Sequence, residues 1–392
     1  MKEVVVVSAV RTPIGAYLGS LKEHAAPALG AFAVKEAARQ AGVAPQEIDE
    51  CLMGNVLSAG VGQAPARQAA IFAGLPNTVR CTTVNRVCGS GLKTVMLGSQ
   101  MIQTGDAQVV LAGGMESMSR APYLLDKARE GYRMGHGKLI DAMIHDGLWD
   151  VYHNNHMGDS AELCASEKKI SRADQDAFAK MSYQRALAAI EAGKFKAEMV
   201  PVPYTEGKEK RILDKDEEPF RAKLDKFGDL KPVFKKEGTV TAANASSLSD
   251  GAAAIALCSM DYAKKHGLKP LARILAQESF AREPEWFTLA PVGAIQKLLQ
   301  KVGKKTNEID LYEINEAFSV VALGCIRELQ LDEGKVNTRG GAVALGHPIG
   351  ASGTRILVSL IHALRQEKKR FGVASLCIGG GEASALLVEA CE

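Results

Sequence analysis

The chain repeats part of itself, and this repeat limits the folds that it can adopt. Short segments recur in the same order at similar offsets, and each contains a glycine, an asparagine or an acidic residue at a comparable place. The recurring pairs are Glu47-Ile48-Asp49 with Glu308-Ile309-Asp310, Val84-Asn85 with Val336-Asn337, Ser90-Gly91 with Ser352-Gly353, and Gly113-Gly114 with Gly379-Gly380-Gly381. Matches of this kind predict two similar halves rather than one continuous architecture.

The first half alternates expected strands with expected helices. The run Val4–Val10 is apolar and mostly β-branched, which predicts a buried parallel strand. Further strands are expected over 48–56, 81–84 and 109–114, with helices over 27–42, 64–73 and from residue 90 to 104. This β-α-β-α-β-α-β order is typical of an α/β fold with helices on both faces of a sheet. A second series with the same character begins near residue 271.

A long irregular insertion interrupts the first half. Residues 171–193 read as an amphipathic helix that Ser171 can cap, whereas 194–238 is polar and rich in lysine. A stretch this long without periodicity is usually functional. We therefore expect three units: residues 1–118 with 248–268 as an N-terminal half, 119–247 as a loop domain, and 269–392 as a C-terminal half.

Composition excludes several classes of protein. The 392 residues carry a net charge of only +3, which does not favour nucleic acid as a partner. No apolar run reaches the length of a membrane span, so no membrane association is expected. The eight cysteines form no CxxC pair, which indicates reduced thiols. Because no signal peptide is recognisable before the first strand, we expect a cytoplasmic location.

Cys88 is the first candidate for chemistry. It lies between the expected strand 81–84 and a helix that ends at Gly105. The free backbone N–H groups of a helix N-terminus favour a thiolate over a thiol. Gly89 and Gly91 allow a ligand to approach the backbone closely. The alternative is a buried structural cysteine.

Three further candidates stand at expected strand ends in the second half. His347 is flanked by Gly346 and Pro348, which fix the backbone that carries the imidazole. Cys377 precedes three glycines whose N–H groups can stabilise an oxyanion. Asn315 can hold a water or polarise a carbonyl, and its alternative role is that of a turn residue. Two thiols and an imidazole indicate covalent acyl chemistry, in which one thiolate attacks, the imidazole takes its proton and the second thiol moves protons.

Together these residues resemble the thiolase family from about residue 3 to residue 390. The matching motifs are Asn85-Arg86-Val87-Cys88-Gly89-Ser90-Gly91, Gly113-Gly114-Met115-Glu116-Ser117-Met118-Ser119, Asn315-Glu316-Ala317-Phe318, Gly346-His347-Pro348-Ile349-Gly350 and Cys377-Ile378-Gly379-Gly380-Gly381. The presence of both cysteines separates thiolases from the related ketoacyl synthases, which carry a second histidine. The resemblance implies two repeated βαβαβαββ halves, stacked in five layers α-β-α-β-α, with an inserted loop domain.

The resemblance also implies roles for the site residues. Cys88 would be the nucleophile that takes an acyl group from a thioester, and His347 would activate it. Cys377 would remove the α-proton of a second acyl-CoA. His347 and a water on Asn315 would hold the enolate, and the backbone N–H groups of Cys88 and Gly379 would hold the tetrahedral oxyanion. No metal and no organic cofactor would be required, because coenzyme A is substrate and product.

Other residues match the family positions that bind acyl-CoA. They are Leu148, His156, Met157, Arg221, Phe234, Ala242, Ser246, Leu248, Ala317 and Phe318. No motif near Arg221 fixes its register. The Lys-rich stretch around it is either a phosphate-facing patch or solvated surface. His153 and His156 have a spacing found in metal sites, but no nearby partner pattern supports zinc.

Three segments resemble the acetoacetyl-CoA type of the family, namely Gly147-Leu148, His156-Met157-Gly158 and Arg133-Met134-Gly135. The last belongs to the segment that joins dimers into tetramers in that type, so a homotetramer is expected. The bulky Trp286-Phe287 favours short acyl groups. The leading hypothesis is reversible condensation of two acetyl-CoA. The alternatives are a broader 3-ketoacyl-CoA thiolase of fatty-acid breakdown and a non-catalytic acyl-CoA-binding protein.

Overall fold

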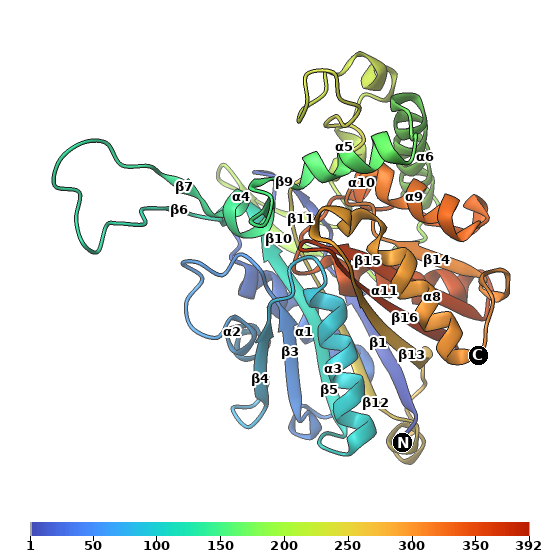
Figure 1. Ribbon diagram of the computed structural model, residues 1–392. Helices are drawn as coiled ribbons and strands as arrows, with labels where there is room; N and C mark the ends of the chain where they lie inside the picture. Colours follow the sequence, from blue (N-terminus) through green and yellow to red (C-terminus); the bar gives the residue numbers. More distant parts are fainter. Residues whose placement is uncertain (1, 392) are drawn as a thin grey trace.

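The computed structural model describes residues 2–391, and ten of its strands form one mixed sheet (Figure 1). The other strands form three two-stranded sheets. In spatial order they are β14 (Leu311–Ile314), β15 (Phe371–Ile378), β16 (Glu382–Ala390), β13 (Ala272–Ala281), β1 (Val4–Arg11), β12 (Ser249–Ser259), β5 (Val109–Ser117), β3 (Glu50–Gly54) and β4 (Arg80–Val84), with β2 (Gly15–Ala16) paired to β12. Outward from the boundary between β1 and β13, the order β1, β12, β5, β3 in one half corresponds to the order β13, β16, β15, β14 in the other.

Matched contacts confirm the internal repeat. The carboxylate of Asp49 accepts the backbone N–H groups of Gln108 and Val109 at the start of β5, at 2.7 and 3.1 Å. The carboxylate of Asp310 accepts the N–H groups of residues 370 and 371 at the start of β15, at 3.1 and 2.8 Å. Asp49 and Asp310 of the repeated sequence therefore bind the first backbone N–H groups of equivalent strands, one in each half.

The two halves join along β1, and here one prediction was wrong. β1 is fully buried, but it runs antiparallel to both of its neighbours, β12 and β13. A continuous apolar run indicates that both faces of a strand are buried. It does not indicate whether the adjacent strands run parallel or antiparallel to it. The pairing with β13 covers only Val4–Val6, and it is this pairing that links the two halves into one sheet.

Alternate residues of the strands face different layers. Val4 and Val6 of β1 pack in the same central cluster as Leu376 of β15 and Leu386 of β16, whereas Val5 and Val7 face an outer layer. The central layer is α3 (Ser90–Thr104) with α11 (Ser352–Gln366). The outer layers are α1 (Ala26–Ala41) and α2 (Pro65–Phe72) on one side, and α8 (Ala290–Val302) and α9 (Ser319–Leu329) on the other. The expected α-β-α-β-α stack is confirmed.

The two glycine runs that were matched in the sequence do not occupy equivalent positions in the two halves. Gly113 and Gly114 lie inside β5, which continues to Ser117, whereas Gly379–Gly381 lie in the loop after β15. A side chain at Gly114 would overlap the carbonyl oxygen of Gly350. The glycines of β5 therefore permit close packing between the halves, and they are not equivalents of the loop glycines.

The inserted segment carries more regular structure than its sequence suggested. Ser171 caps α6 (Arg172–Glu191) as predicted, in a capping box with Asp174. The remaining elements are β6 (Tyr123–Leu124), β7 (Ile140–Asp141), α4 (Ala142–Gly147), β8 (Trp149–Asp150), β9 (Asn155–His156), α5 (Met157–Glu167), β10 (Val202–Glu206) and β11 (Glu209–Leu213). The polar segment 194–238 thus contains the hairpin β10–β11, which lacks an apolar face and gave no strand signal. Two short helices lie outside the insertion, α7 (Met260–Lys265) and α10 (Ala342–Leu345).

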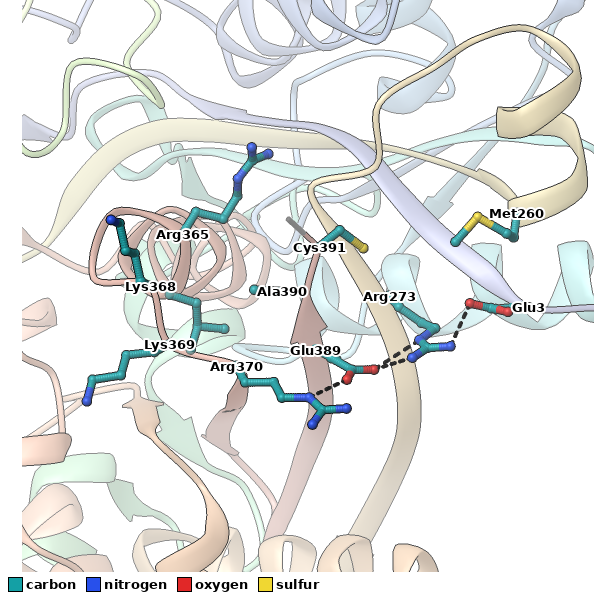
Figure 2. A pocket seen from close by; sticks show the side chains of 11 residues that line it. Glu3, Met260, Arg273, Arg365, Lys368, Lys369, Arg370, Glu389, Ala390 and Cys391 are labelled. Atoms are coloured by element: carbon teal, nitrogen blue, oxygen red, sulfur yellow. Dashed lines mark hydrogen bonds and ion pairs between the residues drawn. The ribbon is translucent and has the colours of Figure 1, made fainter.

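A wide groove of about 830 Å³ lies at the edge where α11 ends and β13 and β16 meet (Figure 2). Five basic side chains line it, and two of them, Arg273 and Arg370, pair with Glu389. None of the residues predicted for the active site lines this groove. Across residues 2–391, no helix has the length and apolar character needed to cross a bilayer.

Candidate active site

A tight turn between β4 and α3 presents Cys88. Val87 takes a left-handed conformation, with φ of 45°, which is rare for a β-branched residue. The turn is held by Ser90, whose hydroxyl accepts the Arg86 N–H at 2.8 Å and donates to the Val87 carbonyl at 2.6 Å. A side chain at Gly89 would overlap Ile378. The strained turn and the glycine let the second half pack directly against the residue that follows Cys88.

The environment of Cys88 favours a thiol at rest, which corrects the expected thiolate. Burial raises the pKa of Cys88 to about 11, and the charge of Glu116 adds to this. The backbone N–H groups of Gly379 and of Cys88 itself act in the opposite direction, because they donate toward the sulfur. Burial outweighs the helix N-terminus here. The two N–H groups predicted to hold an oxyanion nevertheless converge on the Cys88 sulfur.

His347 is buried and held as a neutral ring. Its Nδ1 lies 2.6 Å from the Ser352 hydroxyl, which itself donates to the Pro348 carbonyl. Ser352 Oγ therefore accepts from Nδ1–H, and the Nε2 lone pair is left free to accept a proton. Burial, followed by the positive charge of Arg355, lowers the pKa of His347 to about 3. The ring is a base that stays unprotonated until a reacting group offers a proton.

Asn315 and Arg355 complete the surroundings of His347. The Asn315 amide nitrogen lies 3.5 Å from His347 Nε2, and its amide oxygen accepts from Arg355 at 3.3 Å. Arg355 thereby fixes which end of the amide faces the imidazole. The guanidinium is buried and lies 3.7 Å from Glu313, whose pKa burial raises to about 8. Sequence reasoning missed Arg355 and the role of Ser352, because α11 reads as an ordinary core helix.

Cys377 lies at the end of β15, next to the turn that carries Gly379. Its side chain is buried, and burial raises its pKa well above the usual range. The second cause is the charge that Cys88 would carry, which places the two sulfur atoms within electrostatic reach of each other. The structure therefore brings Cys88, Gly379 and Cys377 into one region.

Glu116 holds the loops of the two halves together, a role that the sequence did not predict. Its carboxylate accepts the N–H groups of Val56, Leu57 and Gly350 at 2.9 to 3.2 Å, and the Asn55 amide at 2.7 Å. The residue is fully buried, and burial raises its pKa to about 7. It thus joins the 55–57 loop of the first half to the loop that carries His347.

Most residues predicted to bind acyl-CoA gather in two apolar clusters beside the cysteines. One cluster holds Cys377 with Met157, Ala317, Phe318 and Phe234. In the other, Leu148 and Leu248 pack against the same buried group as Cys88. His156 caps α5 and lies over Phe234, with ring centroids 4.8 Å apart. Burial lowers the pKa of His156, although the charge of Asp159 opposes this.

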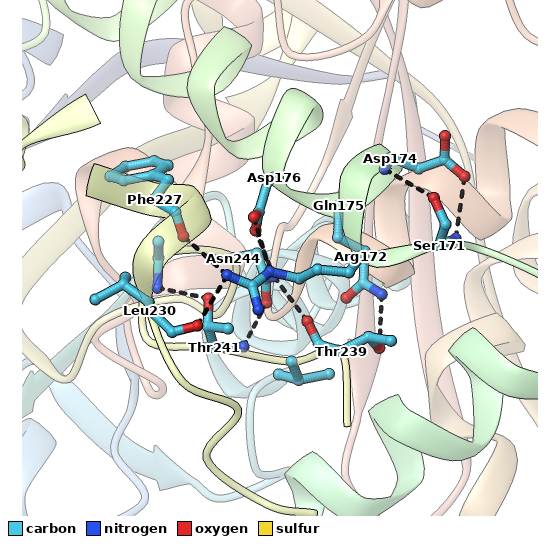
Figure 3. A network of polar contacts seen from close by, with 12 residues as sticks. Ser171, Arg172, Asp174, Gln175, Asp176, Phe227, Leu230, Thr239, Thr241 and Asn244 are labelled. Carbon is cyan, nitrogen blue, oxygen red and sulfur yellow. Dashed lines mark hydrogen bonds and ion pairs between the residues drawn. The ribbon is translucent and has the colours of Figure 1, made fainter. Parts of the chain in front are cut away.

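A polar network positions the segment that carries Ala242, Ser246 and Leu248. Figure 3 shows Arg172 and Asp176 of α6 beside Asn244, whose amide donates to Asp176 at 2.9 Å. The Asn244 carbonyl accepts the Ser319 N–H at 2.8 Å, and the Ser246 N–H donates to the Ala317 carbonyl at 3.0 Å. Ala242 is exposed and Ser246 is half-buried. The loop domain is thereby tied to the start of α9, next to the site.

Arg221 belongs to neither of the two apolar clusters. It is exposed and lines a groove of about 570 Å³ together with Ser20, Lys22 and Tyr204. No other residue predicted to bind acyl-CoA lines that groove.

No cluster of three or more potential metal-binding side chains occurs within residues 2–391. His153 instead lies 2.9 Å from Asp150 and 3.5 Å from Glu285, which raises its pKa above the usual value. His156 uses its Nδ1 to accept the Gly158 N–H at 3.1 Å, as part of a helix cap. The two histidines of the metal-like spacing therefore have separate partners.

The arrangement suits acyl transfer through a thioester. It offers a thiol under two backbone N–H donors, a second buried thiol, and a neutral imidazole with one free nitrogen beside an amide. Such donors stabilise a tetrahedral oxyanion, and a neutral base beside a thiol activates it at the moment of attack.

Comparison with known proteins gives a consistent result. Residues 4–261 match the model of the thiolase N-terminal domain, and residues 268–390 match that of the thiolase C-terminal domain. An acetyl-CoA acetyltransferase of Cupriavidus necator is 51% identical over 391 residues, covering 99% of this chain and 100% of that protein. The mitochondrial acetyl-CoA acetyltransferase of Homo sapiens is 50% identical, with 99% and 91% covered. The crystal structure of the Bacillus anthracis acetyl-CoA acetyltransferase superposes with a TM-score of 0.98 at 42% identity, and it covers 100% of this chain and 99% of that one.

Proposed function

Because the chain belongs to the thiolase family, we propose that it is an acetyl-CoA C-acetyltransferase, which interconverts two acetyl-CoA with acetoacetyl-CoA and CoA. Relatives named acetyl-CoA acetyltransferase match it over nearly its full length at about 50% identity. The single observation that supports the mechanism is the buried His347 ring, whose Nδ1 lies 2.6 Å from the Ser352 hydroxyl and whose Nε2 lies 3.5 Å from the Asn315 amide nitrogen.

In the first step Cys88 attacks the carbonyl carbon of acetyl-CoA. His347 Nε2 takes the thiol proton, for which its Nδ1–H bond to Ser352 leaves the lone pair free. The tetrahedral oxyanion lies under the N–H groups of Cys88 and Gly379. As the C–S bond to CoA breaks, Cys377 gives its proton to the departing sulfur. The raised pKa of Cys377 favours this order, because the residue begins as a thiol.

In the second step the Cys377 thiolate removes the α-proton of a second acetyl-CoA. The enolate oxygen is held by the protonated Nε2 of His347 and by a water on the Asn315 amide. The α-carbon attacks the acyl-Cys88 carbonyl, and the intermediate collapses to acetoacetyl-CoA. Cys88 recovers its proton from His347, and Cys377 already carries the proton of the α-carbon. No cofactor takes part in these steps.

We propose a preference for short acyl groups, supported by the bulky side chains of the cluster that holds Cys377. Phe287 is buried in the same cluster as Cys377, Met157 and Phe318, and Trp286 packs against it. Thiolysis of acetoacetyl-CoA is compared with that of longer 3-ketoacyl-CoA esters. We expect the highest kcat/KM with acetoacetyl-CoA, and higher values with long chains would favour the broad thiolase of fatty-acid breakdown.

Mass spectrometry separates an enzyme from a passive acyl-CoA-binding protein. Acetyl-CoA is mixed with the protein, and the peptide that carries Cys88 is examined for an acetyl adduct. We expect the adduct on Cys88 alone, with free CoA released in equal amount. A protein that binds acetyl-CoA without acylation would favour the non-catalytic alternative.

We also propose a homotetramer, supported by the arm between Tyr123 and Asp141. This arm projects from the body of the protein (Figure 1), and it exposes Leu125, Met134 and Leu139 to solvent. Met134 is 98% exposed, which is unusual for a large apolar side chain in a protein that works alone. Sedimentation velocity measures the assembly state. We expect a tetramer for the natural chain and a smaller species for Met134→Asp combined with Leu139→Asp.

A reducing compartment such as the cytoplasm is proposed, supported by eight free cysteines. Titration of thiols in freshly purified, denatured protein tests this, and the full number of free thiols is expected.

A further inference from the structure

Asn337, the repeated asparagine of the second half, holds the end of β14 through its side chain. Its amide oxygen accepts the Ile314 N–H at 2.8 Å, and its amide nitrogen donates to the Ile314 carbonyl at 2.8 Å. The same amide nitrogen donates to Oε1 of Glu316 at 2.8 Å. Asn337 therefore fixes both residues that flank Asn315 in the sequence.

Glu316 extends this support to the segment that leads to His347. Its buried carboxylate accepts the backbone N–H of Val343 at 3.1 Å, in the first turn of α10. Beyond His347, the Gly350 N–H donates to Glu116 at 2.9 Å. The segment that carries the imidazole is thus held by one buried carboxylate before the ring and by another after it.

The loop domain supplies a third partner of the Glu316 carboxylate. The Ser182 hydroxyl of α6 donates to Oε2 of Glu316 at 2.7 Å and accepts the Gly341 N–H at 3.0 Å. A side chain at Gly340 would overlap the Ser182 carbonyl oxygen, and one at Gly341 would overlap the Glu316 carboxylate. The two glycines therefore let α6 pack directly onto the backbone that precedes α10.

All three of these partners of Glu316 are donors. Asn337 and Val343 offer N–H groups, and the Ser182 hydroxyl is left to donate because its oxygen already accepts from a backbone N–H. Such a set suits an ionised carboxylate, although burial raises the pKa of Glu316. A neutral amide in its place would oppose one donor to another.

We propose that Glu316 is a positioning residue for the condensation step, which fixes the separation of Asn315 and His347 and ties it to α6 of the loop domain. This role rests on the proposed function, in which His347 and a water on Asn315 hold the same enolate oxygen. Two groups that must meet one atom tolerate little change in their separation, which is 3.5 Å from the amide nitrogen to Nε2. The attack of Cys88 uses the imidazole alone, so acylation depends less on this distance.

The variant Glu316→Gln tests the proposal on the full chain, because it keeps the size of the side chain and replaces one acceptor by a donor. Rapid-quench mass spectrometry follows acetylation of Cys88, and acetoacetyl-CoA formation follows condensation, both at saturating acetyl-CoA. We expect condensation to fall by about 10²-fold and acylation by less than about threefold. A folded variant in which both steps fall by the same factor, or neither falls, would overturn the proposal.

Asp310→Asn is the matched control for this variant. Asp310 lies before β14, at the opposite end from Glu316, and its carboxylate also accepts two backbone N–H groups, at 3.1 and 2.8 Å. We expect a lower free energy of unfolding with the natural ratio of condensation to acylation. The same change of ratio in Asp310→Asn would overturn the proposal, because a general loosening of β14 would then explain both results.

Ser182→Ala provides a second test that does not depend on the folding of the Glu316 variant. Loss of one of the three hydrogen bonds is expected to lower condensation by about fivefold and to leave acylation unchanged. The natural ratio of the two steps in folded Ser182→Ala would overturn the tie to α6. The natural chain is measured in parallel, and failure of that chain to acetylate Cys88 or to condense would refute the proposed function itself.

Discussion

The two halves of the molecule share a strand order, yet they supply different chemistry. The first half provides Cys88 at the N-terminus of α3, and the second provides His347, Asn315 and Cys377 at the ends of loops and strands. The position in the second half that corresponds to Cys88, two residues before the repeated Ser-Gly, is Gly350. Its N–H donates to Glu116 at 2.9 Å, and a side chain there would meet the same carboxylate. The turn in the first half thus carries a thiol side chain at Cys88. The corresponding turn in the second half has no side chain at Gly350 and packs directly against Glu116.

This difference teaches that a repeated fold can divide a reaction between its copies. Each half places a helix N-terminus in the central layer, but only one of these sites carries a cysteine, the nucleophile that we propose. The corresponding position in the second half is Gly350, and the lack of a side chain there lets the loop that carries His347 pack against the first half. The predictions below test this division, from the largest expected effect to the smallest.

Removal of the nucleophile from the first half should abolish the reaction. Cys88→Ala is expected to lose at least about 10⁴-fold in kcat/KM for thiolysis, because no acyl-enzyme can form. The measurement is steady-state thiolysis of acetoacetyl-CoA, together with mass spectrometry for acetyl transfer from acetyl-CoA. Normal acylation of another residue in this variant would end the assignment of Cys88.

Removal of the acid and base from the second half should separate the two steps. Cys377→Ala is expected to retain an acyl-Cys88 adduct while condensation falls by about 10³-fold, since only the proton transfer at the α-carbon is lost. Rapid-quench mass spectrometry follows acylation, and acetoacetyl-CoA formation follows condensation. Cys325→Ala, another buried cysteine, serves as the control and should condense at close to the natural rate. Condensation at the natural rate in Cys377→Ala would contradict the proposed role.

Loss of the charge behind the imidazole should have a smaller effect on rate and a visible effect on pH dependence. Arg355→Met frees the Asn315 amide from its fixed orientation, and kcat is expected to fall by about 10²-fold. The positive charge of Arg355 lowers the pKa of His347, so its removal raises that pKa and moves the acid limb of kcat/KM to higher pH. The pH–rate profile from pH 4 to pH 9 measures the shift.

A neighbouring arginine provides the control for this variant. Arg365 lies on the same helix, α11, but it is exposed and faces the groove of Figure 2. Arg365→Met is expected to keep both the rate and the pH profile of the natural enzyme. A profile that is unshifted in Arg355→Met but lower in amplitude at all pH values would indicate a purely structural role for Arg355.

The closed turn of the second half should tolerate no side chain. In Gly350→Ala the new methyl group would lie 2.6 Å from Glu116 and 2.8 Å from the Met115 carbonyl oxygen. We expect the free energy of unfolding to fall by about 1–3 kcal/mol, a typical cost of overpacking. Chemical denaturation of purified protein measures it. Gly228→Ala is the control, because a Cβ at Gly228 meets no atom within 4 Å and the stability should change little.

The sequence predicted the layers of the fold and the chemical groups of the site. It did not predict the direction of β1 or the protonation states of the site residues. Val4–Val10, Ser171 and the acidic residues of the repeat each have a strong local signal, and the corresponding elements are present. The direction of β1 carries no such signal, because a strand covered on both faces looks the same in either orientation. The hairpin β10–β11 was missed for the opposite reason, since its exposed strands lack apolar alternation.

The state of the site could not be read from spacing alone. The thiol at Cys88 and the neutral ring at His347 result mainly from burial, and the charges of Glu116 and Arg355 act in the same direction. A helix N-terminus can be recognised locally, but the desolvation that outweighs it cannot.

The pairing of β1 with β12 and β13 has a consequence for synthesis of the chain. Both partners lie beyond residue 248, so the strand that leaves the ribosome first has no neighbour until more than half of the polypeptide has emerged. Its apolar residues must remain protected during that interval, because contacts between distant segments form slowly. Nascent chains stalled before β12 should therefore bind chaperones through their first few residues, and extension past residue 281 should release them.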